Sequence, residues 1–166
     1  MKNFNKYIQH FITITKHKYY VGIECFKRGL YWQGIVHDLS KYSVTEFFAS
    51  AAYFQGDRSS IEAEKEEKGY SLAWLNHKAK NKHHWMYWTD REDGEEFAVP
   101  MPKKYIIEML CDFIGAGKVY NPKGWTTKEP LQYYEKTKHT MLLHEDTRVI
   151  FERMLRDLAT IDNLST

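Results

Sequence analysis

The sequence predicts an all-α fold, a single compact multi-helix domain over residues 1–166. Apolar side chains recur at three- and four-residue steps through several segments, which is the spacing of one helix face. No segment alternates convincingly between apolar and polar residues, as a half-exposed strand would. A chain of 166 residues with 43% hydrophobic residues is long enough for one buried core and short for two domains, and it shows no linker or internal repeat.

Start and stop signals divide this pattern into helices. Gly29 follows the first periodic segment and is expected to end it. Ser43, with Glu46 three residues later, is typical of a capping box that opens another helix. Pro102 is expected to start a helix with an apolar buried side. The segments predicted to be helical are 4–27, 31–39, 43–54, a charged helix capped by Ser59 or Ser60 that runs through 62–68, 102–114, 130–140 and 146–161. Residues 77–88 are predicted to be helical or partly helical.

The segments between these helices are expected to be loops. Gly69 is placed to interrupt the chain after the charged helix 62–68. Residues 89–102 contain two aspartates, a glycine and two prolines, a composition typical of turns. We therefore expect a surface loop there, and a second loop around residues 121–125.

Charge and composition exclude several classes of protein. The formal net charge is +2, from 24 Lys and Arg against 22 Asp and Glu, so no extended nucleic-acid surface is expected. The sequence contains no run of 18 apolar residues and no signal-peptide pattern, which predicts a cytoplasmic protein that does not engage a membrane. Cys25 and Cys111 are far apart in the sequence and are expected to be reduced core residues.

Histidine and aspartate residues are the strongest indication of chemistry. His37 and Asp38 end an apolar stretch, where an ionised carboxylate is costly unless a cation or strong hydrogen-bond donors meet it. Asp112 lies within an apolar helix face, with Glu108 one turn earlier. His17 holds a similar interior position in the first helix. A metal ion would compensate these buried carboxylates.

A second group of histidines follows later in the chain. Helical spacing places His77 and His84 on one face and turns His83 elsewhere. Imidazole and carboxylate ligands together favour Mn, Fe, Co or Zn over calcium or magnesium. Asp38 is the candidate bridge between two divalent ions, which would lie about 4 Å apart and act together on a phosphate. The candidate metal ligands are His17, His37, Asp38, His77, His83, His84 and Asp112.

These residues resemble the HD superfamily of all-helical, metal-dependent phosphohydrolases, which is named for an adjacent His-Asp pair. In that family an isolated His on the first helix precedes the pair, and an Asp on a later helix completes the site. His17, His37-Asp38 and Asp112 stand in that order. Residues 37–41, His-Asp-Leu-Ser-Lys, also resemble the family's His-Asp-hydrophobic-Gly-Lys turn, with serine in place of glycine. The resemblance implies an HD-like domain and metal-dependent attack on a phosphate.

The resemblance extends to the binuclear members of the superfamily. These members add one His and then an adjacent His pair, which His77 and His83-His84 match. Trinuclear members carry a Glu one turn before the first His, where this chain has Thr13, so two metal ions are implied. The Gly-Tyr-Pro signature of the cyclic-dinucleotide phosphodiesterases is missing, because residues 85–88 are Trp-Met-Tyr-Trp. The resemblance therefore does not extend to their substrate.

Two stretches also resemble an uncharacterised family of bacterial and phage proteins, known only as a domain of unknown function. The first is residues 37–43, His-Asp-Leu-Ser-Lys-Tyr-Ser, followed by Glu46-Phe47. The second combines residues 74–78, Trp-Leu-Asn-His-Lys, with residues 81–84, Asn-Lys-His-His. This likeness covers nearly the whole chain and implies no activity.

Basic side chains near the proposed ligands are candidates for holding a phosphate. Lys41 follows the His-Asp pair by three residues. Asp38 and Lys41 are the candidate catalytic residues. The candidate substrate-binding residues are Lys41, Arg58, Lys78 and Lys82, and the alternative for the lysines is a solvated charged face. The histidines without a partner pattern, expected to be structural or exposed, are His10, His139 and His144.

The sequence therefore predicts a metal-dependent phosphohydrolase or phosphodiesterase that acts on a nucleotide or related small phosphate ester. One alternative is a mixed-valence di-iron oxygenase on the same scaffold, because some HD-fold proteins oxidise C–H bonds with dioxygen. Another alternative is a non-catalytic binding protein that metal stabilises. Metal identity, substrate and oligomeric state are left open.

Overall fold

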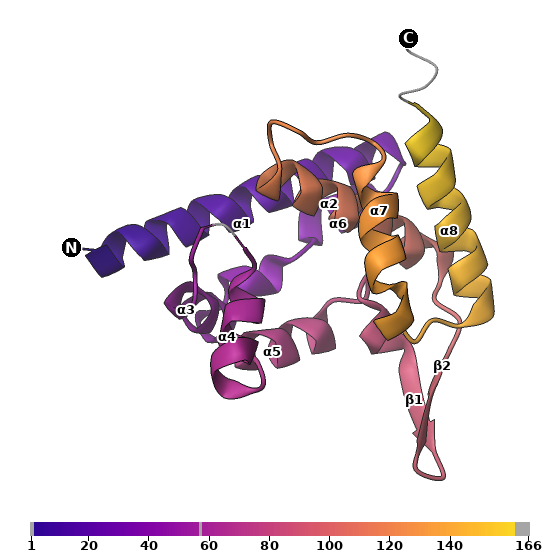
Figure 1. Ribbon diagram of the computed structural model, residues 1–166, viewed down its shortest axis with the longest axis horizontal. Helices are drawn as coiled ribbons and strands as arrows, with labels where there is room; N and C mark the ends of the chain where they lie inside the picture. The colour runs from indigo at the N-terminus through magenta and orange to yellow at the C-terminus, as the bar shows by residue number, and fades with distance from the viewer. Residues whose placement is uncertain (1, 57, 162–166) are drawn as a thin grey trace.

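The computed structural model describes residues 2–56 and 58–161 (Figure 1). This part of the chain is mostly helical, as the sequence predicts, and contains eight α-helices. They are α1 (Lys2–Lys27), α2 (Tyr31–Val36), α3 (Val44–Ala52), α4 (Ser60–Lys68), α5 (Leu72–Lys80), α6 (Lys103–Tyr120), α7 (Glu129–Thr137) and α8 (Glu145–Thr160). Three short 3-10 helices are η1 (Leu39–Tyr42), η2 (Trp85–Trp88) and η3 (Lys138–Thr140). None of the described helices combines the length and apolar character that crossing a membrane requires.

Several helix ends follow the predicted signals. Gly29 and Gly69 have φ values of 74° and 81°, the left-handed conformation that ends a helix at least cost for glycine. Ser43 caps α3, because its side chain accepts a hydrogen bond from the backbone N–H of Glu46. The Glu46 side chain, however, bonds to His77 and Ser40, so its part in the expected capping box is replaced by a tertiary contact.

The expected loop over residues 89–102 is partly wrong, because it contains an antiparallel hairpin of β1 (Thr89–Glu92) and β2 (Glu95–Ala98). Asp93 and Gly94 form the two-residue turn with φ values of 51° and 88°, both left-handed, as a twisted hairpin requires. Most of the hairpin is exposed on both faces, so no apolar alternation marks it in the sequence. It projects away from the helices (Figure 1).

The segment 77–88, predicted to be helical or partly helical, is only partly helical. Helix α5 begins earlier, where Ser71 accepts a hydrogen bond from the N–H of Trp74, and it ends at Lys80. Asn81 then takes an extended conformation, with φ −115° and ψ 105°. His83 and His84 therefore lie in a turn beyond the helix, and helical spacing does not set their directions.

The main core lies among α6, α7 and α8, and α1 packs along the opposite side of α6 (Figure 1). The apolar side expected for residues 102–114 is indeed buried in this core. A smaller apolar cluster between α1 and α6 contains Val21, Cys25 and Cys111, and both cysteines are free thiols as predicted. The buried residues of the main core are Met101, Ile106, Met109, Leu110, Ile114, Tyr134, Met141, Phe151, Leu155 and Leu158.

Gly115 allows α6 to approach α1 closely. A Cβ atom at this position would overlap Cγ2 of Val21 and would lie 3.2 Å from the backbone nitrogen of Val21 and 3.5 Å from the carbonyl oxygen of His17. Asp112 lies one helical turn before Gly115, and its carboxylate is 2.9 Å from Nε2 of His17. The glycine thus brings two predicted metal ligands from different helices together.

We expect Gly115→Ala to lower the free energy of unfolding by about 1–3 kcal/mol, because the added methyl group overpacks a buried helix contact. It should also weaken metal binding, because it separates Asp112 from His17. Urea denaturation and metal titration measure the two effects. Gly22→Ala is the matched control, because a Cβ there meets only a carbonyl oxygen at 3.4 Å. Equal stability of the two variants would contradict the close-packing argument.

Candidate metal centre

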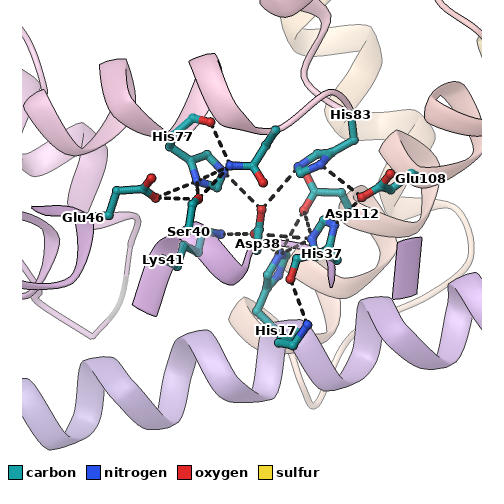
Figure 2. A network of polar contacts seen from close by, with 12 residues as sticks. His17, His37, Asp38, Ser40, Lys41, Glu46, His77, His83, Glu108 and Asp112 are labelled. Carbon is teal, nitrogen blue, oxygen red and sulfur yellow. Dashed lines mark hydrogen bonds and ion pairs between the residues drawn. The ribbon is translucent and has the colours of Figure 1, made fainter. Parts of the chain in front are cut away.

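The seven predicted metal ligands come from five regions of the chain and meet in the interior of the protein. Figure 2 labels all of them except His84. Helix α1 carries His17, and α6 carries Asp112 on the side that faces α1. His37 and Asp38 follow α2 directly. His77 is in the last turn of α5, and His83 and His84 belong to the turn that follows this helix. Segments that are distant in the sequence thus contribute to one cluster.

The chain turns sharply where α2 ends. Asp38 has a φ of 55°, a left-handed conformation that few residues other than glycine adopt but that aspartate tolerates. The ammonium group of Lys18 donates hydrogen bonds to the carbonyl oxygens of Ile35 at 2.5 Å and His37 at 3.0 Å. Lys18 therefore holds the end of α2 in place, and the turn directs the Asp38 carboxylate into the cluster.

Four ligand atoms form a first group, site A. Nε2 of His17 lies 2.9 Å from Oδ1 of Asp112 and 3.3 Å from Oδ2 of Asp38. Nε2 of His37 lies 3.3 Å from the same Asp38 oxygen and 3.4 Å from Nε2 of His17. Two imidazoles and two carboxylates converging within 4.8 Å make a suitable coordination shell for one transition-metal ion.

A second group, site B, forms around the other oxygen of Asp38. Nε2 of His77 lies 3.2 Å from Oδ1 of Asp38, and Nε2 of His83 lies 3.5 Å from it. His84 completes the group, with ligand atoms again within 4.8 Å of one another. Asp38 is the residue that sites A and B share, and one oxygen faces each site. A bridging carboxylate would need this position, and the bridging role of Asp38 stays a prediction.

Two buried carboxylates orient the imidazoles from behind. Oε1 of Glu108 lies 3.0 Å from Nδ1 of His37 and 3.3 Å from Nδ1 of His83. Oε2 of Glu46 lies 2.9 Å from Nδ1 of His77. When Nδ1 donates its proton to a carboxylate, Nε2 is left as the metal-binding nitrogen. Glu108 therefore supports one histidine of each site, whereas Glu46 supports site B alone.

The buried charges in site A depend on one another. Burial by itself would raise the pKa of Asp38, but the charges of His37, Lys41 and His77 hold the pKa well below its ordinary value. Burial would likewise lower the pKa of His37, but Asp38, Asp112 and Glu108 raise the pKa well above its ordinary value. Positive charge close to Asp38 is thus required for its carboxylate to stay ionised in the interior.

Site B has imidazoles suited to ligation. The pKa of His84 is held well below its ordinary value, mostly by burial and further by the charges of the neighbouring His83 and His77. Burial and the charge of His37 lower the pKa of His83. Both rings are therefore neutral near pH 7, the form that binds metals. Nε2 of each ring is buried and makes no hydrogen bond to any residue in the described ranges.

These unpaired nitrogens fit a metal site better than an ordinary polar core. A buried polar atom without a partner costs about 1–3 kcal/mol, and native proteins rarely keep two side by side without a function. The donor set, five imidazoles and two aspartates, has the composition preferred by Mn, Fe, Co and Zn. The buried His, Asp and Glu groups of this protein therefore fit a metal site.

The predicted phosphate-binding residues lie in different places. The ammonium group of Lys41 is 2.5 Å from Oδ2 of Asp38, at the centre itself. Arg58 instead pairs with Glu66 at 2.7 Å and is not brought to the ligand groups by these contacts. Lys78 is half-buried on α5, and Lys82 is exposed, with its ammonium 5.4 Å from the ring centre of Tyr87. Lys41 is therefore the strongest of the four candidates.

Sequence reasoning missed part of the supporting structure. It treated Glu46 only as a helix cap, because no local signal shows that its carboxylate reaches His77. It noted Glu108 one turn before Asp112 but did not include it in the site. It also turned His83 away from His77, whereas the end of α5 at Lys80 brings both into site B.

We expect Glu108→Gln to weaken metal binding at both sites by about ten- to a hundredfold, because the amide orients His37 and His83 less well than a carboxylate. Glu46→Gln should weaken site B alone. Calorimetric titration with Mn²⁺ separates the two outcomes. Glu64→Gln is the control, because Glu64 is an equally buried carboxylate that bonds Ser71 and Lys68 instead of a histidine. Equal metal affinity in all three variants would contradict the supporting role.

Comparison with known proteins identifies a family but no activity. No curated protein matches the chain, and no solved structure does. A family model matches residues 6–157, which include all seven ligands of sites A and B and both supporting carboxylates. Since this match covers most of the chain, the protein belongs to DUF5662, a family of unknown function.

Proposed function

We propose that this protein is a metal-dependent phosphohydrolase of the HD type, acting on a nucleotide or a related small phosphate ester. The observation that carries the proposal is the position of Asp38. Its two oxygens face two separate groups of His and Asp ligands, each large enough for one ion. One buried carboxylate shared by two ligand groups is the arrangement expected of a two-metal hydrolytic site.

The order of the ligands supports the HD resemblance. His17 on α1 precedes the His37-Asp38 pair, His77 and the His83-His84 pair follow, and Asp112 on α6 completes the set. Each comes from its own helix or from the turn after one. The left-handed turn at Asp38 directs the carboxylate into the cluster. This shared arrangement is the basis for proposing the HD type of chemistry.

Each residue of the centre has a defined role in this proposal. His17, His37 and Asp112 would hold one ion, His77, His83 and His84 would hold the other, and Asp38 would be shared between them. A pair of divalent transition-metal ions lowers the pKa of water and stabilises charge on phosphate oxygens. Glu108 and Glu46 keep Nδ1 of the imidazoles protonated, so that Nε2 faces the ions.

Lys41 supplies the positive charge that the protein itself contributes. Its ammonium lies beside Oδ2 of Asp38, the oxygen that faces site A, where it can donate to a phosphate oxygen as well. In the reaction the oxygen of water joins phosphorus and the P–O bond to the substrate alcohol breaks. The leaving oxygen takes a proton, so that water and ester give an alcohol and a phosphate. Lys41 would stabilise the charge that builds on the phosphate oxygens.

We expect about two transition-metal ions per chain in protein purified without chelator, measured by elemental mass spectrometry. Asp38→Ala should lose both ions, because it deletes the bridge. His17→Ala and His84→Ala should each lose one, because each removes a ligand from one site only. His139→Ala, a histidine outside both ligand groups, is the control and should keep both ions.

Several results would contradict this proposal. Absence of metal after reconstitution with Mn²⁺ or Fe²⁺ would exclude a metalloenzyme. Full metal content in Asp38→Ala would exclude the bridge. Consumption of dioxygen by the iron-loaded protein, without phosphate release under anaerobic conditions with Mn²⁺, would favour the di-iron oxygenase. Unchanged biological function of an Asp38→Asn variant that lacks metal would favour a non-catalytic binding protein.

We expect Lys41→Met to lower hydrolysis of p-nitrophenyl phosphate by about ten- to a thousandfold, because one charge that stabilises the transition state is removed. Folding and metal content should be unchanged. Lys128→Met, which removes an exposed lysine outside the candidate site, is the control and should retain full activity. Normal turnover by Lys41→Met would contradict the catalytic role. Loss of stability with full activity per folded molecule would show that Lys41 only supports the turn at Asp38.

A further inference from the structure

A pocket lies beside site B and shares residues with the metal centre. Lys41, Glu46 and His77 form part of its wall, and it extends along α1 to His10 and towards the start of α4 at Ser60. We call it the side pocket. Its enclosed volume is about 60 Å³. One water needs about 10–15 Å³ on the same measure, so the side pocket has room for a small polar group of a few atoms.

Two buried polar atoms of the lining residues make no hydrogen bond to any residue in the parts of the chain that the structure describes. They are Nδ1 of His10 and Oε1 of Glu46. The two residues are only 4% and 2% exposed. Glu46 uses its other oxygen to support His77, so Oε1 remains as an acceptor. Buried groups of this kind normally have partners, and a bound molecule with hydroxyl groups would supply them.

The charge along the pocket changes with distance from the metal centre. At the centre, Lys41 is the one permanently cationic side chain among the described lining residues. At the far end, burial above all, and the charge of Lys41 in addition, lower the pKa of His10 to about 4, so its ring is neutral near pH 7. Phe47 and Phe54 hold this ring at centroid distances of 5.4 Å.

This distribution favours a ligand with one phosphate and an uncharged polar body. The metal ligands and Lys41 suit a single phosphoryl group. A second phosphate in the side pocket would approach the carboxylate of Glu46 without another cation to compensate it. A hydroxyl group both donates and accepts, so it can satisfy the acceptor Oε1 of Glu46 and Nδ1 of His10 in either tautomer.

We infer that the side pocket binds the hydroxylated part of the substrate, and that the substrate is the monophosphate of a sugar or other polyol, alone or within a nucleotide. His10 is then a specificity-determining residue that contacts a substrate hydroxyl. The inference rests on the proposed function, because it places the phosphate at the metal centre. It replaces the expectation that His10 is a structural histidine only.

Binding of two matched phosphonates tests this inference without hydrolysis. Methylphosphonate presents the anionic group alone, whereas the phosphonate analogue of ribose 5-phosphate adds the hydroxylated body. Calorimetry with Mn²⁺-loaded protein should give about tenfold tighter binding of the ribose analogue, as one or two hydrogen bonds supply. The corresponding adenosine phosphonate should bind tighter still if the sugar phosphate belongs to a nucleotide, and equally or more weakly if it does not.

His10→Phe replaces the imidazole with an aromatic ring that has no nitrogen atoms. In this variant the tenfold preference should fall to about twofold or less, with methylphosphonate affinity and metal content unchanged. His10→Leu serves the same test if the phenylalanine variant unfolds. His139→Phe is the control and should keep the full preference, because this histidine is exposed and does not line the pocket.

The outcomes distinguish this inference from the proposed function. Equal affinity of the wild-type protein for both phosphonates would overturn the inference, even if phosphate esters are hydrolysed. Full preference in His10→Phe would overturn the role of His10. If the ribose analogue binds preferentially through His10 but ribose 5-phosphate releases no phosphate, the pocket assignment is supported. Only the proposed hydrolysis is then contradicted.

Discussion

The ionised carboxylate of Asp38 in the interior of the protein is the constraint on which the rest of the structure depends. A buried charge is costly unless opposite charges and hydrogen-bond donors surround it. Here the compensation comes from His17 and His37 on one oxygen and His77 and His83 on the other. His17 lies on α1, His37 follows α2, His77 lies on α5 and His83 follows α5, so the position of one carboxylate relates these three helices to one another.

The helix packing is arranged to satisfy this constraint. Gly115 allows α6 to lie against α1, so that Asp112 reaches His17. An ion pair of 2.8 Å between Glu24 on α1 and Lys118 on α6 joins the same two helices farther along. Glu108 binds histidines of both sites through one oxygen, which couples their orientations. Support of this kind distinguishes an organised metal centre from a chance group of polar residues.

The metal centre and the side pocket form one continuous region. Lys41 and His77 belong to both, and Glu46 supports a metal ligand with one oxygen while the other lacks a partner. A ligand that bridges the two regions would satisfy charge at one end and hydrogen bonds at the other. In the two proposals above, the phosphate lies at the candidate metal centre and the hydroxyl groups lie in the side pocket.

The sequence by itself determined the mostly helical fold, the ends of helices at Gly29 and Gly69, and the set of metal-type residues, because these depend on local spacing and residue chemistry. Only the tertiary structure decided how the residues are used. The α5 helix ends at Lys80, which brings His83 to site B against helical spacing. The Glu46 side chain bonds to His77 on α5 instead of completing the capping box at the start of its own helix. The residues of the hairpin do not alternate between apolar and polar in the sequence, because most of them are exposed and neither face of the hairpin packs on a core. Long-range contacts decide such details, and local patterns do not encode them.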